Sequence, residues 1–134
     1  MLNNSAMSSI GILLLRFTVA GLMLFHGIAK ITHPASLEHI ASALTGAGLP
    51  SVIAYGVLVG EVIAPLMIIT GLYTRIGGLL IVANMVFAIA LSHSGDIFML
   101  SKHGGWAIEL QAFYLFGGLA IAVLGSGKFA LKPD

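Results

Sequence analysis

The stretch SIGILLLRFTVAGLMLFHGIA, residues 9–29, decides the fold class. A helix needs about 20 mostly apolar residues to cross the hydrocarbon core of a bilayer, and this stretch has that length and composition. Three more apolar stretches follow at residues 51–72, 76–92 and 106–124, and the third of the four is the shortest. The sequence therefore predicts an all-α integral membrane four-helix bundle that forms a single domain over residues 1–134.

The composition of the whole chain supports a membrane protein. Of its 134 residues, 58% are hydrophobic and 8% are charged, whereas an ordinary soluble domain has about 25% charged residues. The net charge is only +1 and no basic run occurs, so nucleic acid is not an expected partner. Cysteine is absent, which excludes disulfides and thiolate ligands supplied by this chain, and we expect no metal site. The expected surroundings are the lipid bilayer.

The longest connection between the apolar stretches also has a helical pattern. Leu37, Ile40, Ala41 and Leu44 recur at helical spacing after Pro34. We therefore expect a short amphipathic helix over residues 35–45, between the first and second spans. It either lies at the membrane interface or packs over the mouth of the bundle.

The distribution of basic residues predicts an orientation. With four spans both termini lie on one side, together with Arg75, Lys128 and Lys132, and with Arg16 if its side chain reaches the surface. The opposite side carries the two residues Lys30 and Lys102. Because basic residues favour the cytoplasmic side, both termini are predicted to be cytoplasmic.

Four polar or charged side chains fall within apolar stretches: Arg16, His26, Glu61 and Glu109. A charge at the centre of a span costs about 2.5–3.5 kcal/mol on insertion scales, so such groups usually face the bundle interior and pair. At about 1.5 Å per residue, Arg16 and Glu61 lie close enough in depth for two long side chains to meet. We therefore predict an Arg16–Glu61 ion pair, which either locks helices together or forms the polar floor of a pocket.

The other polar groups lie nearer the opposite end of the spans. Arg16, Met23, His26 and Lys30 form a heptad-like stripe on the first helix, and His93 and Glu109 fall near the level of His26. This layer suggests a pocket for a quinone or another small amphipathic ligand. Two histidines at one depth would also suit haem ligation, but no other feature supports it. The predicted ligand-binding residues are His26, Lys30, Glu61 and Glu109, with Phe113 in an aromatic lid.

Several short motifs occur in an order that is found in a known family. They are LR at 15–16 with GLMLFHGIAK at 21–30, GE at 60–61 with GLYTR at 71–75, NMVFAI at 84–89, GGWAIE at 104–109 and GSGKF at 125–129. This ordered set, which covers nearly the whole chain, resembles the DoxX family. The resemblance implies a four-helix bundle in the bacterial cytoplasmic (inner) membrane.

The resemblance also bears on function. The family's repeated polar residues fall here on Arg16, His26, Lys30, Glu61, Arg75 and Glu109. Family names refer to subunits of thiosulfate:quinone or quinol oxidoreductases, and some members resemble membrane partners of redox or detoxification proteins. No cofactor-ligand pattern and no catalytic motif come with the resemblance.

The predicted function is therefore that of an accessory or scaffold subunit for a quinone-linked redox or detoxification partner. That partner would be a membrane or peripheral redox protein, and quinone is the cofactor that this function implies. Two alternatives stay open: a non-enzymatic assembly or stress factor with a purely structural polar core, and a small-solute carrier. The sequence also leaves open whether the chain is a homo-oligomer and whether it catalyses a reaction.

Overall fold

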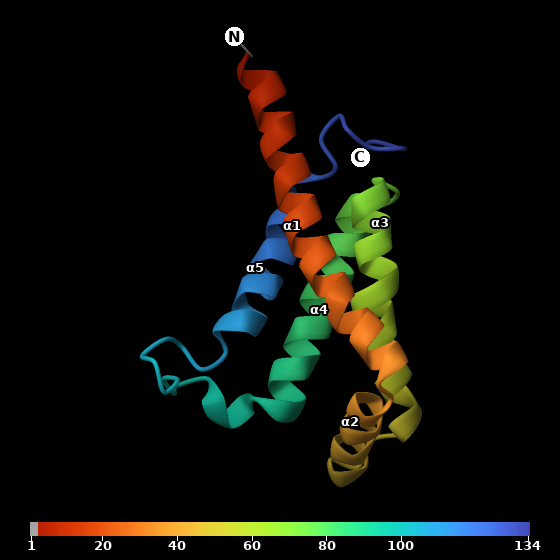
Figure 1. The fold of residues 1–134 in the computed structure, drawn as a ribbon, viewed down its shortest axis with the longest axis vertical. Helices are drawn as coiled ribbons and strands as arrows, with labels where there is room; N and C mark the ends of the chain where they lie inside the picture. Colours follow the sequence, from red (N-terminus) through yellow and green to blue (C-terminus); the bar gives the residue numbers. More distant parts are fainter. Residues whose placement is uncertain (1–2) are drawn as a thin grey trace.

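The computed structural model describes residues 3–134, and helices without any strand make up the regular structure of this part of the chain. The prediction of an all-helical membrane bundle is confirmed. The N-terminus and the C-terminal tail lie at one end of the bundle, and α2 lies at the other (Figure 1). In chain order the elements are α1 (Asn4–Thr32), α2 (Ala35–Gly46), η1 (Ser51–Gly56), η2 (Val59–Ile63), α3 (Ala64–Thr70), α4 (Thr74–Ser92), η3 (Ser94–Asp96) and α5 (Glu109–Leu124).

Helix α1 is longer than the first apolar stretch. It starts at Asn4 because the side chain of Asn3 caps it, accepting a hydrogen bond of 2.7 Å from the main-chain N–H of Ala6. It then runs for 29 residues to Thr32, and its first turns project beyond the rest of the bundle (Figure 1).

The second apolar stretch forms three helical pieces of different geometry. A 3₁₀ segment, η1, is followed by the π-helical turn η2 and then by α3. The N–H of Ala64 donates to the main-chain carbonyl of Val59, five residues earlier, which is the π-helical pattern. Pro65, at the start of α3, has no N–H that could donate to the carbonyl of Glu61. The carbonyl of Glu61, in the middle of the span, therefore lacks the usual α-helical hydrogen bond from the residue four positions later.

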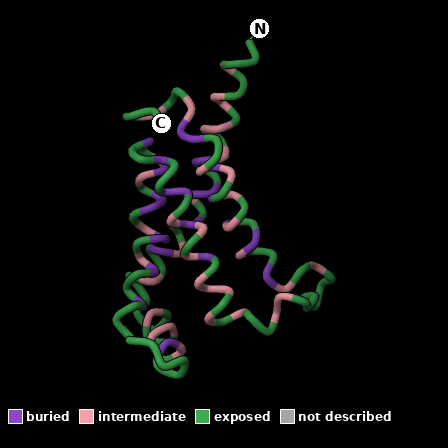
Figure 2. Tube along the Cα trace, turned by 180° about the vertical axis from the view of Figure 1, so that it is seen from behind, coloured by how far each residue is buried: buried purple, intermediate pink, exposed green. Residues whose placement is uncertain are grey.

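The four bundle segments pack around one apolar core. Its buried members are Val19, Ala20, Met23, Ala64, Ile68, Ile81, Met85, Tyr114 and Ile121. Buried stretches of the trace face the middle of the molecule, whereas its outer faces are exposed (Figure 2). Those outer faces carry large apolar side chains, including Phe17, Phe25 and Val123. An apolar exterior is what a bundle surrounded by lipid requires.

Within residues 3–134, three helical segments are long and apolar enough to cross a membrane: Asn4–Thr32, Ser51–Thr70 and Thr74–Ser92. Helix α5 is shorter, with 16 residues, because the residues before Glu109 form a hairpin and not a helix. Leu100 bridges to Trp106, and the indole N–H of Trp106 donates to the carbonyl of Ile97 at 2.6 Å. These contacts take Trp106 out of the helix that the sequence predicts from that residue.

Helix α2 confirms the short helix predicted in the first connection. It contacts η1, α1 and α4, and its Leu44 is fully buried. The helix therefore packs over one end of the bundle, and its residues Ser36, His39 and Ile40 help to line a cavity there.

Candidate functional site

A cavity of about 630 Å³ lies in the half of the bundle next to α2. This volume is within the range of roughly 300–1,000 Å³ that small-molecule sites have. Its polar lining residues come from α1, α2, η2, α4 and α5: His26, Lys30, Ser36, His39, Glu61, Asn84, Ser92, His93, Gln111 and Tyr114. Its apolar wall includes Met23, Ile40, Val57, Met85, Phe87, Leu91 and Leu110. A wall that combines polar and apolar side chains suits an amphipathic ligand.

An ion pair between Lys30 and Glu61 forms part of the wall. The ammonium Nζ lies 3.0 Å from each carboxylate oxygen, and it donates a hydrogen bond to Oε1. No described residue donates a hydrogen bond to Oε2, although the Glu61 side chain is only 7% exposed. This oxygen is itself buried, and its close contact is the Lys30 ammonium, so the ion pair as a whole forms the charged part of the cavity wall.

The ion pair depends on a close contact between α1 and the π turn. Gly27 of α1 lies against the main-chain carbonyl of Glu61, where a Cβ atom would clash with that carbonyl and with Val62. Lys30 is three residues further along α1, so this approach brings its ammonium to the carboxylate of Glu61. The π turn presents Glu61, as such turns often present functional residues.

His26 and Tyr114 form the next part of the wall. Their rings meet edge to face, with centroids 5.7 Å apart and planes at 87°. His26 lies one helical turn before Lys30, so α1 presents an imidazole and an ammonium to the same cavity. Tyr114 of α5 is buried and holds the two helices together at this level.

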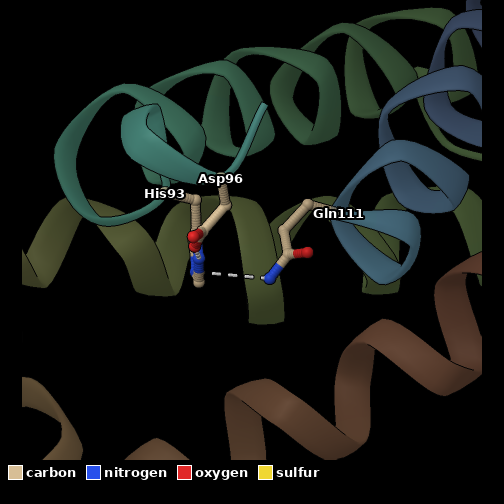
Figure 3. Close-up of polar contacts among 3 residues, drawn as sticks. All are labelled: His93, Asp96 and Gln111. Atoms are coloured by element: carbon tan, nitrogen blue, oxygen red, sulfur yellow. Dashed lines mark hydrogen bonds and ion pairs between the residues drawn. The ribbon is translucent and has the colours of Figure 1, made fainter. Parts of the chain in front are cut away.

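A chain of polar contacts links the cavity to the loop after α4. The Nδ1 atom of His93 lies 3.4 Å from Oδ2 of Asp96, and Nε2 of His93 lies 3.3 Å from Nε2 of Gln111. Figure 3 shows Gln111 reaching from α5 toward the histidine ring, with Asp96 beside that ring. His93 and Gln111 line the cavity, and Asp96 is half exposed. This cluster can hold a ligand oxygen or pass a proton.

The structure brings together three of the predicted site residues, His26, Lys30 and Glu61, around the cavity. Glu109 and Phe113 do not line it. Glu109 is exposed in the first turn of α5, and Phe113 is 74% exposed. At about 100° of rotation per residue, Gln111 and Tyr114 of α5 turn inward while Phe113 turns outward. On this side the cavity is therefore lined by the amide of Gln111 and the phenol of Tyr114, and not by the predicted aromatic lid.

The structure also corrects the partner that the sequence suggested for Arg16. The guanidinium is fully buried and donates to four main-chain carbonyls, those of Ile68, Ile69, Ser126 and Phe129, at 2.6–3.1 Å. Glu61 pairs with Lys30 instead, so no Arg16–Glu61 ion pair forms. Arg16 precedes Lys30 by about 21 Å of helix, at about 1.5 Å per residue. It therefore reaches the end of α3 and the C-terminal tail.

Sequence reasoning missed four of the cavity residues: Gln111, Tyr114, Asn84 and His39. The spacing of three between Gln111 and Tyr114 places both on one face of α5, and this signal could have identified them. His39 depends on where α2 packs, which no local pattern reveals. Among residues 3–134, no group of three or more His, Cys, Asp or Glu side chains is placed to hold a metal ion.

Comparison with known proteins gives a family and two relatives. The DoxX family profile matches residues 11–94. The chain is 30% identical over 124 residues to a Bacillus subtilis (strain 168) protein named "Putative oxidoreductase CatD", covering 92% of this chain and 86% of that protein. It is also 30% identical over 121 residues to an uncharacterized protein of Haemophilus influenzae, covering 87% and 84% of the two chains. No solved structure matches.

Proposed function

The chain belongs to the DoxX family, and from this membership and the cavity beside the Lys30–Glu61 pair we propose that it is an accessory membrane subunit that holds a quinone-class ligand for a redox or detoxification partner. In this proposal the subunit lies in the cytoplasmic membrane of a bacterium. The observation that carries the proposal is the buried ion pair in the wall of an amphipathic cavity.

The chemistry of the cavity suits a small ring with oxygen substituents. Lys30 supplies a cationic donor for a ligand carbonyl, and the carboxylate of Glu61 supplies an acceptor for a ligand hydroxyl. Met23, Met85 and Phe87 supply apolar contacts for the ring faces. A quinone presents carbonyls and its reduced form presents hydroxyls, so one pair of side chains serves both states.

The proposed partner is a membrane or peripheral redox protein. The relative from Bacillus subtilis is named "Putative oxidoreductase CatD", and this name supports a redox role for the complex that we propose. This chain has no cysteine from which a dithiol or an iron–sulfur centre could be built. We therefore assign ligand binding to this subunit and electron transfer to its partner.

A binding measurement tests the proposal. The purified protein in lipid nanodiscs is titrated with a short-chain benzoquinone by isothermal titration calorimetry, and saturable binding is expected. Glu61→Gln removes one charge of the ion pair and leaves the Lys30 ammonium without its counterion in the wall. Because a hydrogen bond to a charged group contributes about 1.5–3 kcal/mol, we expect the affinity to fall by roughly tenfold or more.

Glu109→Gln is the matched control, since it is the same change at an exposed carboxyl outside the cavity. It should leave the affinity unchanged. An equal loss in both variants would show that the effect is not specific to the cavity. An absence of saturable binding in the unaltered protein would overturn the proposal and favour a structural polar core.

A further inference from the structure

We propose that His93 and Asp96 form a proton pathway between a hydroxyl group of the ligand in the cavity and the water outside the loop after α4. This inference rests on the proposed function, because it assumes that the cavity holds an oxygen-bearing ring. It assigns an acid–base role to His93, and ligand binding alone would not require such a role.

The position of His93 connects two environments. It follows the last residue of α4 and lines the cavity, while its Nδ1 faces Asp96 of η3 at 3.4 Å. The side chain of Asp96 is 50% exposed, and that of His93 is 35% exposed. One ring nitrogen therefore lies beside a carboxylate in contact with water, and the other lies on the side of Gln111 and the cavity (Figure 3).

The neighbours of His93 define its neutral tautomer. The side-chain nitrogen of Gln111 can only donate, so Nε2 of His93 is the acceptor in their 3.3 Å contact. The proton of the neutral ring then lies on Nδ1 and is donated to Asp96. A basic nitrogen on the cavity side with a carboxylate behind the ring is the arrangement that general base catalysis uses.

The other titratable groups of the cavity are less suited to exchanging protons with water. Glu61 is 7% exposed and paired with Lys30, so its protonation would disrupt that ion pair. His26 meets Tyr114 edge to face and has no carboxylate within hydrogen-bond distance among the described residues. The titratable and charged groups that face this cavity from the packed elements are His26, Lys30, His39, Glu61, His93 and Tyr114.

The transfer itself involves protons only. The O–H bond of the ligand hydroxyl breaks, and its proton forms an N–H bond at Nε2 of His93, which leaves an oxyanion and an imidazolium. The Gln111 amide must turn in this step, so that its oxygen accepts from the new N–H where its nitrogen had donated. The imidazolium can then release its Nδ1 proton through Asp96 to water, which leaves the neutral ring with its proton on Nε2.

The test uses 4-nitrophenol, because the absorbance of this phenol reports its ionisation directly. It is titrated into the purified protein in lipid nanodiscs across a range of pH. In the unaltered protein we expect the bound phenol to ionise at a midpoint about one pH unit or more below that of free phenol, since the imidazolium that forms when His93 takes up the phenol proton favours the anion. In His93→Gln we expect the midpoint to return toward that of free phenol.

Asp96→Asn provides a second variant that leaves the ring in place, and we expect it to give an intermediate midpoint. His103→Gln is the matched control, because His103 is exposed in the same loop and does not line the cavity. An unchanged midpoint in both His93→Gln and Asp96→Asn, with binding retained, would overturn the pathway but not the ligand site. Failure of the phenol and of a benzoquinone to bind the unaltered protein would overturn both.

Discussion

Arg16 shows how main-chain carbonyls can serve as the hydrogen-bond partners of one buried cation. Its guanidinium donates to the carbonyls of Ile68 and Ile69 in the last turn of α3, and to those of Ser126 and Phe129 in the tail. Carbonyls at a helix C-terminus lack intrahelical partners and carry the negative end of the helix dipole. The residue therefore completes the end of α3 and fastens the tail to α1.

Two double-mutant cycles at residue scale distinguish this arrangement from an Arg16–Glu61 pair. Lys30→Met and Glu61→Gln should couple by roughly 0.5–3 kcal/mol, because the two side chains are in contact. Arg16→Leu and Glu61→Gln should be additive within about 0.5 kcal/mol, because they share no hydrogen-bond partner. Arg16→Leu alone should destabilise the protein by roughly 2–4 kcal/mol.

Unfolding of the purified variants in detergent, followed by circular dichroism, measures both cycles under the same conditions. Strong coupling between Arg16 and Glu61 would contradict the carbonyl arrangement. Negligible coupling between Lys30 and Glu61 would contradict the ion pair in the cavity wall.

At the scale of elements, the crossing of α1 and the π turn decides the position of Glu61. Gly27 allows α1 to lie against the main-chain carbonyl of Glu61, and Pro65 prevents that carbonyl from being used in an ordinary α-helical bond. Gly60 makes a second close contact, with Asn84 of α4. The turn is therefore held from two sides by neighbouring helices.

Replacement of Gly27 by alanine should disturb the site through this crossing. The new Cβ would clash with the Glu61 carbonyl and lie 2.6 Å from a methyl group of Val62, so α1 and the turn must separate. We expect a loss of stability of about 1–3 kcal/mol and weaker benzoquinone binding. Gly21→Ala is the matched control, because nothing lies within 4 Å of its Cβ, and it should stabilise α1 by up to about 1 kcal/mol.

Thermal unfolding and calorimetry on these two variants check the prediction. Equal stability of both alanine variants would mean that the crossing of α1 and η2 is looser than the structure has it. In that case Glu61 would not be positioned by Gly27.

The elements also show what the sequence could predict. Apolar length indicated the bundle, and the spacing of Leu37, Ile40 and Leu44 indicated α2, because both features follow from which faces must be buried. The π turn and the inward face of α5 could not be predicted in this way. They depend on hydrogen bonds between main-chain groups and on contacts between distant helices, which leave no periodic pattern.

The same reasoning applies to the site. Lys30 and His26 were placed together because one helix carries both at a spacing of four. The partner of Arg16 was missed because main-chain carbonyls are present at every residue and so give no signal in a sequence. Phe113 was expected in the cavity because its aromatic ring suits a ligand, but it lies on the outer face of α5, where lipid also favours an aromatic ring.

The molecule as a whole has two polar ends of different character. At the end with the termini, the exposed residues Arg75, Lys128 and Lys132 lie near the tail. At the opposite end, Lys30 is paired with Glu61, which leaves Lys102 in the loop after α4. With Arg16 buried, three basic residues therefore lie at the end with the termini, against two at the other end, and one of those two is paired with Glu61.

This asymmetry predicts the orientation of the bundle in the membrane. Because basic residues are retained on the cytoplasmic side, the termini should be cytoplasmic, and the cavity mouth beside α2 should face outward. The chain has no cysteine, so single cysteines can be introduced without removing others. Ser101→Cys, in the exposed loop, should react with a membrane-impermeant maleimide in intact bacterial cells, whereas Leu131→Cys, in the exposed tail, should react only after permeabilisation. The reverse labelling pattern would contradict this orientation and would place the water-exposed end of the His93–Asp96 pathway in the cytoplasm.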